Sequence, residues 1–378
     1  MSERTERSEG HERMPGQHGM SERTDRSEGH ERMAGQHGMR ERTERSEGHE
    51  RMPGQHGTST PVTVLSVTGW CRNGSTIIGN VLGEVPGVAH VGELHFLWKN
   101  STGRGVNDRC GCGEALTACP LWSAVLPVGR PAGVSADAHA AEVIRRQRAR
   151  LRTRHTWRVL RRGASDADSR AHADLLGAVY REVAARTGAR VIVDSTKIPG
   201  ESALLPHVPG VEPYWLHLVR DPRAVAHSWR EPKEYVYAMS AARSTAYWHG
   251  FNLASAAIDR RYPDRSMLLR YEDFAADPAG TVDALLRLVG ADPAGNPVHD
   301  RTVELRGNHT VTGNPDRFRT GPTVIRDTDD GWRRTLTGRQ RLAVAALAWP
   351  LSTRYGYRPG GTARTHPGAA ARVGETER

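Results

Sequence analysis

A glycine-rich turn between an apolar run and a helix-like segment constrains the fold more than any other part of the sequence. The run at 62–67 is rich in β-branched residues, as buried strands are, and the apolar spacing at 77–82 is typical of a helix face. A strand, a glycine loop and a helix in this order aim backbone N–H groups and the positive end of the helix at one point, which favours an anion. The sequence therefore predicts an α/β fold with an anion-binding turn.

The glycine turn matches the Walker A pattern of phosphate-binding loops with one departure. Gly69 and Gly74 have the spacing of that pattern and Thr76 matches its last position, but Ser75 stands where the pattern has lysine. In nucleotide hydrolases that lysine reaches the β- and γ-phosphates, so its absence disfavours hydrolysis of ATP or GTP. We expect Arg72 to supply the positive charge instead.

A second segment of the same kind lies farther along the chain. The run at 214–219 predicts another strand, Arg220 follows its end, and Pro222 suits the first turn of a helix that Asp221 caps. Ser228 lies two turns into this helix. Because ligands bind at the carboxyl ends of strands in open α/β sheets, we expect a second anion site on the same edge of the sheet.

The two segments together resemble the nucleotide-binding elements of the sulfotransferases that use 3′-phosphoadenosine 5′-phosphosulfate (PAPS). The resembling patterns are G-x-x-R-[NS]-G-[ST]-T and V-R-D-P-R-x-V-x-x-S-W, and the resemblance covers roughly residues 62–357. It implies a single α/β domain of the type of the P-loop-containing nucleoside triphosphate hydrolases, with a central parallel sheet flanked by helices. Further segments agree with a bacterial branch that also resembles tyrosylprotein sulfotransferases: 90–93, 110–122, 194–197, 270–273 and 354–357.

The resemblance implies a role for the residues of both elements. In this family the glycine loop holds the 5′-phosphosulfate, and an Arg/Ser pair holds the 3′-phosphate of PAPS. Arg220 and Ser228 would form that pair. The loop would be formed by Arg72, Asn73, Gly74, Ser75 and Thr76.

Sulfuryl transfer needs a base that takes the proton of the acceptor, and Glu93 is the candidate. It follows the predicted strand 88–91, which we expect to lie beside the strand at 62–67, so that its carboxylate faces the glycine loop. The resemblance implies the same role for this glutamate. His95 is the rival, because the cytosolic branch of the family uses a histidine, although from a different sequence context.

The transfer also needs a cation at the bridging oxygen of the leaving group. Of the 53 lysines and arginines in the chain, only the residues at 99, 197 and 233 are lysines. Lys197 follows the apolar run 191–193 and Asp194, again at a strand end, and a compact ammonium suits a point charge. We therefore expect Lys197 to stabilise the leaving group and Arg72 to share this work.

Two segments in the C-terminal half carry further expectations. The basic run at 314–321 is expected to close over the nucleotide, with Arg317 and Arg319 as cofactor-binding residues. A loop that bears arginines is also commonly just solvated. The residues 270–273 end another predicted strand, 267–269, and are interpreted as structural.

Three cysteines have part of the spacing of a zinc site. Cys110, Cys112 and Cys119 lack a clear fourth ligand in the sequence, although Cys71 or a histidine could serve. Structural thiols are the favoured interpretation. Sulfuryl transfer requires no metal in principle and no acidic metal pair is evident, so the sequence predicts no metal cofactor.

A helical stretch at 136–162 is dense in arginine. The simplest interpretation is a solvated helix face, and the functional one is contact with an anionic acceptor or a weak contact with a membrane surface. The arginines are Arg145, Arg146, Arg148, Arg150, Arg152 and Arg154.

The ends of the chain differ from its body. Residues 1–57 are three copies of a 19-residue unit without Val, Ile, Leu, Phe, Trp or Tyr, so they cannot bury enough apolar surface to offset the entropy of ordering. We expect disorder in these repeats and in the tail at 359–378, and a folded domain at 58–358. The histidines of the repeats could bind metal weakly, but a tandem duplication without chemistry is favoured.

Charge and hydropathy exclude other classes of protein. The net charge is +10, and the repeats hold 12 acidic residues against 10 arginines, so the basic excess belongs to the body. No apolar run reaches the roughly 20 residues of a membrane span. No hydrophobic signal segment is present, and four cysteines in a chain this long make no disulfide scaffold.

The sequence thus predicts a cytoplasmic enzyme that moves a sulfuryl group from PAPS to a hydroxyl or amine. The expected acceptor is a small molecule or carbohydrate-like compound, and no specific nucleic-acid binding is expected. One alternative is a P-loop kinase, which the missing Walker lysine disfavours. The other is a non-catalytic protein that binds polyanions through its arginines.

Overall fold

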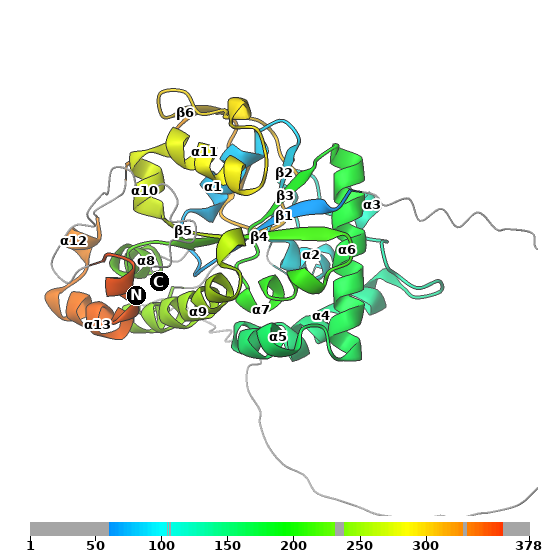
Figure 1. Cartoon of the computed structure of the whole chain (residues 1–378), viewed down its shortest axis with the longest axis horizontal. Coiled ribbons are helices and arrows are strands. Elements are labelled where there is room, and N and C mark those ends of the chain that lie inside the picture. Colours follow the sequence, from blue (N-terminus) through cyan, green and yellow to red (C-terminus); the bar gives the residue numbers. More distant parts are fainter. Residues whose placement is uncertain (1–59, 104, 106, 231–237, 328–330, 358–378) are drawn as a thin grey trace, which may run out of the picture. The chain divides into compact units, whose positions relative to one another are not determined.

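A five-stranded parallel sheet forms the centre of the fold (Figure 1). The computed structural model describes residues 60–357 apart from 104, 106, 231–237 and 328–330, so the predictions for the repeats, the C-terminal tail and Lys233 lie outside the described residues. The strand order is β2-β3-β1-β4-β5. The strands are β1 (Val62–Thr68), β2 (Val88–Gly92), β3 (Val191–Asp194), β4 (Val211–Val219) and β5 (Ser266–Arg270).

Strand β1 is buried on both faces because helices cover the sheet on both sides. Val64 packs into one cluster of core residues, whereas Leu65 and Val67 pack into another. A parallel strand in the middle of a sheet is a continuous apolar run for this reason. Helices α1 (Ser75–Gly83) and α11 (Pro278–Leu288) cover one face, and α6 (Ala167–Thr187) and α7 (Pro199–Ser202) cover the other (Figure 1).

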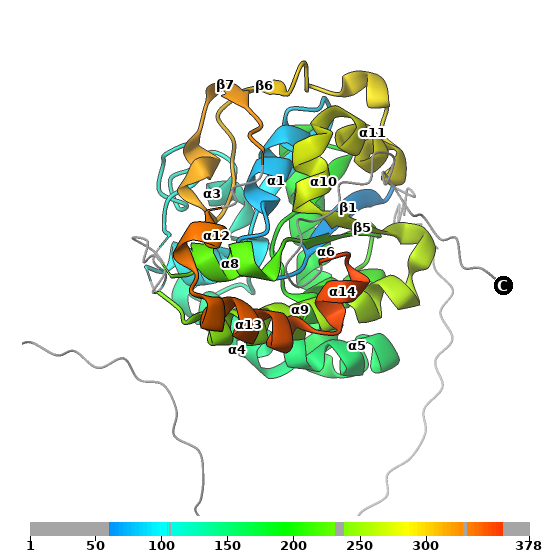
Figure 2. The same ribbon diagram turned by 90° about the vertical axis from the view of Figure 1, so that its left-hand side faces the viewer.

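Three helices that are distant in sequence pack together near the carboxyl end of β4. Helices α8 (Pro222–Ser228), α9 (Ala241–Arg261) and α13 (Gly338–Ala348) lie side by side (Figure 2). The other helices are α2 (Leu97–Ser101), α3 (Trp122–Val125), α4 (Ala136–Arg150), α5 (Thr156–Arg162), α10 (Tyr271–Ala276), α12 (Trp332–Thr335) and α14 (Leu351–Arg354).

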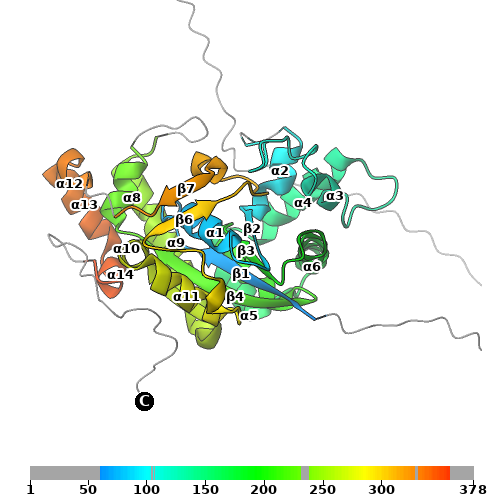
Figure 3. The ribbon, with the colours of Figure 1, turned by 90° about the horizontal axis from the view of Figure 1, so that it is seen from above.

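Two short antiparallel strands form a second, separate sheet. Strands β6 (Thr302–Leu305) and β7 (Gly321–Val324) pair with each other. The segment between them packs against α1, as the view from above shows (Figure 3). Asn80 of α1 donates a hydrogen bond to the carbonyl oxygen of Asp316, 236 positions later. The contact therefore places a segment from far along the chain next to the helix that follows the glycine loop.

Most predicted strands agree with the structure. β1, β2, β3 and β5 match the predicted ranges to within one residue at each end, and β4 begins three residues earlier than predicted, at Val211. The predicted helix after Arg220 is α8, with Pro222 in its first turn and Asp221 as its cap, because the Asp221 carboxylate accepts from the Arg223 N–H. The predicted fold class, an α/β domain with a parallel sheet flanked by helices, is confirmed.

The predicted position of β2 is wrong. We expected it beside β1, but β3 lies between them, with Val64 of β1 in register with Ile192 and Ala89 of β2 on the other side of Ile192. All four residues of β3 are buried. A short strand that is apolar on both faces takes an interior position, whereas β2 forms the edge.

The predicted helix at 136–162 is also wrong, because the chain breaks in its middle. Helix α4 ends at Arg150 and α5 begins at Thr156. Between them Leu151 is fully buried in the core. The carbonyl groups of Leu151 and Arg152 approach Gly200 so closely that a Cβ atom there would lie 2.5 Å and 2.4 Å from their oxygens. Tertiary packing therefore overrides the helical propensity of this stretch.

Among the residues that the structure describes, no helix is both long enough and apolar enough to cross a membrane.

Candidate active site

The carboxyl ends of all five strands of the sheet meet at one cavity. Its volume is about 370 Å³, a size typical of sites for small ligands. The glycine loop follows β1, and the other strands lead to Glu93, Lys197, Arg220 and Tyr271 in turn. The predicted site residues that line the cavity are Arg72, Gly74, Ser75, Thr76, Glu93, Lys197, Arg220 and Ser228.

The glycine loop needs a glycine at position 74. Gly74 is the N-cap of α1 with φ 94°, and a Cβ atom there would lie 2.2 Å from the ring of Tyr271. As glycine has no side chain to cap the helix, N–H groups of the first turn are left for an anion. Asn73 is buried and does not line the cavity. Its side chain donates to the Leu218 carbonyl at 2.8 Å and accepts from the Ser75 N–H at 3.2 Å, so it fixes the loop onto β4.

Two arginines lie against aromatic rings in the cavity wall. The guanidinium carbon of Arg220 is 4.8 Å from the ring centre of Tyr271, and that of Arg72 is 5.1 Å from the ring centre of Trp229. Arg220 also donates to the Arg72 carbonyl at 3.2 Å, which joins the two predicted anion-binding elements. Its buried Nε has no hydrogen-bond partner among the described residues. Ser228, the last residue of α8, faces the same cavity.

Lys197 and Glu93 form an ion pair in the cavity wall. The Lys197 ammonium donates to Glu93 Oε1 at 2.7 Å and to the Ser195 carbonyl at 2.6 Å. Burial favours the neutral amine, but Glu93, Cys71 and Asp194 together outweigh this effect, Glu93 most strongly, and raise the pKa of Lys197. Lys197 and Arg72 also have positive φ angles of 59° and 69°. Residues with side chains rarely adopt such angles, and those that do are often found at functional sites.

A buried histidine lies behind this ion pair. One ring nitrogen of His90 contacts the Ser195 hydroxyl at 3.0 Å and the other contacts Asn80 Oδ1 at 3.2 Å. Burial, with a smaller effect of the Lys197 ammonium, lowers the pKa of His90 from 6.5 to about 3. His90 is therefore a neutral hydrogen-bonding group that supports the segment bearing Lys197.

His90 is expected to make the protein less stable in mild acid. Between its lowered pKa and 6.5 the unfolded chain binds a proton that the folded chain does not, so the free energy of unfolding falls as the pH falls. Relative to His90→Gln, the wild type should lose about 2 kcal/mol between about pH 7 and about pH 5, as measured by urea unfolding.

The comparison with His90→Gln isolates the effect of the histidine on stability. This is needed because another buried group, Asp194, changes the stability in the opposite direction as the pH falls. Burial raises the pKa of Asp194 to about 6, so this carboxyl takes up its proton in the folded state and adds stability as the pH falls. It is present in both proteins and cancels. An unchanged difference between the two proteins across the pH range would contradict the buried neutral state of His90.

His95, the rival base, faces away from the main cavity. Its Nδ1 pairs with the buried carboxylate of Glu201, which also contacts His172 at 3.4 Å. His95 lines a smaller neighbouring cavity instead. Of the two candidates for the base, only Glu93 shares a cavity with the glycine loop.

A long loop between β6 and β7 completes the cavity beside Glu93. The Glu93 N–H donates to the Val311 carbonyl at 2.8 Å, and the Val311 N–H donates to the Val91 carbonyl at 2.9 Å. This pairing extends the edge of the sheet beyond β2. The loop residues that line the cavity are Thr312, Gly313, Asn314 and Asp316.

Two arginines of this loop, Arg317 and Arg319, do not line the cavity. Arg317 is 1% exposed, and it donates to the carbonyls of Thr310 and Arg109. Arg319 is exposed and pairs with Asp316 at 3.5 Å. Carbonyl groups inside the fold engage Arg317, and an exposed carboxylate pairs with Arg319. The expectation that they bind the nucleotide stays a prediction.

The cavity also contains residues to which we gave no binding role in the sequence, among them Tyr271 of the segment 270–273, which was interpreted as structural. Tyr271 follows β5, and its position at a strand end was the signal that could have identified it. Lys99 was counted among the rare lysines but given no role. Cys71 was considered only as a metal ligand, and the other residues without an earlier role are Ile77, Phe96, Asn100, Asn107 and Trp229.

The structure places a histidine beside the three cysteines, where the sequence showed no clear fourth ligand. Nδ1 of His309 lies 3.3 Å from Sγ of Cys119 and 3.6 Å from Sγ of Cys110, and Cys112 completes the group. Cys71 instead belongs to the wall of the main cavity. The distance of 190 positions between Cys119 and His309 hides this grouping in the sequence.

A parallel sheet with a phosphate-binding type of loop after β1, and with cations after β3 and β4, is typical of α/β proteins that bind phosphorylated ligands. A comparison with protein families is more specific. The family described as "Sulfotransferase family" matches residues 65–293, more than half of the chain, so the protein belongs to the sulfotransferase family. A comparison with curated proteins finds no match.

Several solved structures are similar to parts of the chain. The sulfotransferase domain of the olefin synthase from Synechococcus PCC 7002 is 20% identical, with a TM-score of 0.45, and the match covers 79% of this chain and 96% of that one. The sulfotransferase domain of the curacin biosynthetic pathway is 15% identical, with a TM-score of 0.41 and coverage of 79% and 98%. Sulfotransferase STF9 from Mycobacterium avium is 15% identical, with a TM-score of 0.35 and coverage of 62% and 67%.

Proposed function

We propose that the protein transfers a sulfuryl group from PAPS to a hydroxyl or amine of an acceptor. The observation that carries this proposal is the meeting of two anion-binding elements and a Lys–Glu pair in one cavity. A nucleotide with a phosphosulfate at one end and a 3′-phosphate at the other needs cationic or N–H donors at two places. The glycine loop and the segment that begins at Arg220 provide them.

The residues present fit the two ends of the donor. The uncapped first turn of α1 and the guanidinium of Arg72 suit the 5′-phosphosulfate. Arg220 and Ser228 suit the 3′-phosphate, and the buried Nε of Arg220, without a partner among the described residues, is a donor available for it. Asn73 acts indirectly, because it holds the loop in place.

The Lys–Glu pair suits the transfer step. An S–O bond forms to the acceptor oxygen, or an S–N bond to the acceptor nitrogen, while the S–O bond to the bridging phosphate oxygen breaks. Glu93 takes the proton of the acceptor, and Lys197 and Arg72 stabilise the negative charge that develops on the bridging oxygen. As in phosphoryl transfer, most of the catalysis comes from positioning and charge stabilisation.

The acceptor side of the cavity is basic. Lys99 lines the main cavity and also two neighbouring cavities, which Arg148 and Arg152 line as well. These groups place positive charge next to the cavity that Glu93 lines. They support a small-molecule or carbohydrate-like acceptor that carries a negative charge near the reacting group.

Other expectations for the chain stay predictions. These are the branch that resembles tyrosylprotein sulfotransferases, the folded domain at 58–358 with disordered ends, the cytoplasmic location, and the weak contact with a membrane surface. The expected lack of specific nucleic-acid binding is also a prediction.

Arg220→Ala is expected to weaken the binding of adenosine 3′,5′-bisphosphate, the desulfated donor. Hydrogen bonds to charged groups contribute about 1.5–3 kcal/mol, so the affinity should fall about 10- to 100-fold, as measured by isothermal titration calorimetry. Arg287→Ala is the matched control, since it removes the same charge from an exposed position on α11. Its affinity should equal that of the wild type.

The same titrations separate the proposal from its alternatives. Tighter binding of ATP than of adenosine 3′,5′-bisphosphate would contradict it and favour a kinase-like enzyme. DNA binding with a steep salt dependence and no competition by the nucleotide would favour a polyanion-binding protein. Equal affinities of the wild type and Arg220→Ala would remove Arg220 from the nucleotide site.

A further inference from the structure

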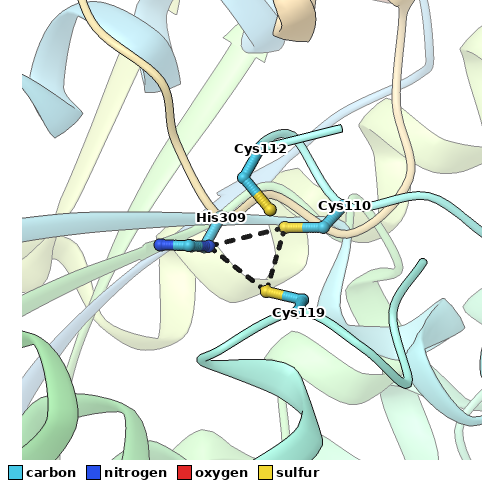
Figure 4. Close-up of side chains that lie close together, drawn as sticks. All are labelled: Cys110, Cys112, Cys119 and His309. Atoms are coloured by element: carbon cyan, nitrogen blue, oxygen red, sulfur yellow. Dashed lines mark hydrogen bonds between the residues drawn. The ribbon is translucent and has the colours of Figure 1, made fainter. Parts of the chain in front are cut away.

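Four side chains from two distant segments converge away from the catalytic cavity. Cys110, Cys112 and Cys119 lie on the segment between α2 and α3, and His309 lies on the loop between β6 and β7. Their sulfur and nitrogen atoms all lie within 4.8 Å of one another and point toward a common centre (Figure 4). All cysteines of this group are free thiols.

The distances in this cluster match the edges of a metal-centred tetrahedron. Cys110 Sγ and Cys119 Sγ are 3.5 Å apart, and His309 Nδ1 is 3.6 Å and 3.3 Å from them. A zinc ion with bonds of about 2.3 Å to sulfur and about 2.0–2.1 Å to nitrogen requires separations of about 3.6–3.8 Å between its ligands. For these three ligands, shifts of a few tenths of an ångström would therefore suffice to admit the ion, and Cys112 Sγ lies within 4.8 Å of each of them.

The backbone around the cluster already holds the ligands in this arrangement. The Cys110 N–H donates to the Glu114 carbonyl at 2.7 Å, which closes the tight turn that carries Cys112. The carbonyl of His309 accepts a hydrogen bond at 2.8 Å from Nε1 of the fully buried Trp122, the first residue of α3. The Gly111 N–H donates to the Thr310 carbonyl at 2.9 Å, so the two segments are joined directly beside the cluster.

A buried positive charge lies next to the cluster. The guanidinium of Arg317 donates to the carbonyls of Arg109 and Thr310, the neighbours of Cys110 and His309 in the chain. Three thiolates more than neutralise a divalent ion. A nearby buried guanidinium stabilises the resulting negative centre.

We propose a structural Zn²⁺ site whose ligands are Cys110, Cys112, Cys119 and His309. Zinc prefers tetrahedral sulfur and nitrogen ligands, and a site with four protein ligands leaves no open position for a reacting group. The site is therefore structural rather than catalytic. This assignment replaces the sequence-based preference for plain thiols, and it does not depend on the proposed donor or acceptor.

The metal would hold the loop that completes the catalytic cavity. His309 precedes the loop residue Val311, which pairs with Glu93 and Val91, and the residues at 312–314 line the cavity. The ion would thus tie the cysteine segment to the position of the candidate base. Loss of zinc should loosen this loop and lower the stability of the folded chain.

The first test is the metal content of the full-length protein, purified under reducing conditions without an affinity tag. We expect one equivalent of zinc by plasma mass spectrometry, and a lower Tm after its removal by a strong chelator, restored by added Zn²⁺. Protein with no bound metal whose Tm does not respond to Zn²⁺ would overturn the proposal, as would iron in place of zinc. A Cys110–Cys119 disulfide in the freshly purified protein would also overturn it.

Cobalt distinguishes this site from the histidines of the N-terminal repeats. Co²⁺ bound by thiolates gives sulfur-to-metal charge-transfer absorption, and residues 1–57 contain no cysteine. Wild-type protein freed of zinc by the chelator should show this absorption at one equivalent of Co²⁺ and lose it when Zn²⁺ is added. Absorption without the charge-transfer component would mean that only histidines bind, which contradicts the proposal.

Variants test the ligands one by one. Cys119→Ser should lower the zinc affinity by more than about 100-fold, since loss of a ligand exceeds the 10- to 100-fold effect of losing an outer-shell partner. Cys112 is exposed, so Cys112→Ser disturbs little packing and tests the site even if Cys119→Ser does not fold. Cys71→Ser is the control for metal content alone and should keep one zinc. Wild-type affinity in Cys112→Ser would overturn the four-ligand assignment.

Discussion

Glu93→Gln is expected to lower kcat for sulfuryl transfer by about 10²–10⁴-fold, the usual contribution of a general base. The glutamine fills the same space and can still accept a hydrogen bond from Lys197, which now donates to Glu93 Oε1 at 2.7 Å. It cannot take a proton from the acceptor. The affinity for adenosine 3′,5′-bisphosphate should change little, because the nucleotide-binding residues lie on other strand ends. Steady-state kinetics and calorimetry measure the two effects separately.

The control for this variant is Glu304→Gln, which makes the same change at an exposed position of β6. It should keep the wild-type kcat. Glu93→Asp retains a carboxylate on a shorter side chain and should recover part of the activity. If Glu93→Gln turned over at nearly the wild-type rate, the base would have to be another group, and His95 would need to leave its pairing with Glu201 to serve.

Lys197→Ala is expected to lower kcat by about 10²–10³-fold, comparable to the loss of one preorganised donor to a developing negative charge. It should also destabilise the protein, because Glu93 then lacks its partner. Removal of one member of a buried ion pair costs about 3–5 kcal/mol, and we expect the lower end since the Glu93 side chain is 17% exposed. Urea unfolding measures this cost, and single-turnover kinetics measure the transfer step.

The double variant Lys197→Ala/Glu93→Gln separates the two roles of the lysine. Without a charged glutamate, the free energy of unfolding should regain most of what Lys197→Ala loses. The transfer step should stay as slow as in the slower single variant. If the double variant recovered the rate together with the stability, Lys197 would act only by holding the fold. Arg72 would then be the remaining candidate for the cation at the leaving group.

The local sequence predicted those features that depend on neighbouring residues. The β-branched run before Gly69 is the buried strand β1. The helix after the loop begins at Ser75, directly after Gly74, as the glycine pattern predicts. The same holds for Asp221 and Pro222 at the start of α8. Glu93, Lys197 and Arg220 could be selected because parallel strands present their carboxyl ends at one edge of the sheet.

The sequence predicted poorly those features of the structure that depend on contacts between residues far apart in the chain. The edge position of β2, the break at Leu151 and the burial of Arg317 are each set by residues far along the chain. The grouping of His309 with the three cysteines has the same origin. Nothing in the spacing of the arginines distinguishes Arg317, which binds carbonyls inside the fold, from Arg220, which faces the cavity.

The sequence by itself determined the α/β class, the glycine loop and the residues that follow each strand. These depend on apolar period, backbone freedom and helix capping, which act over a few residues. The tertiary structure alone decided that Lys197 pairs with Glu93, that the loop after β6 completes the cavity, and that His309 meets three cysteines. These contacts join segments about 100 to 200 positions apart, and only the packing of the whole domain selects among the partners that each side chain could have.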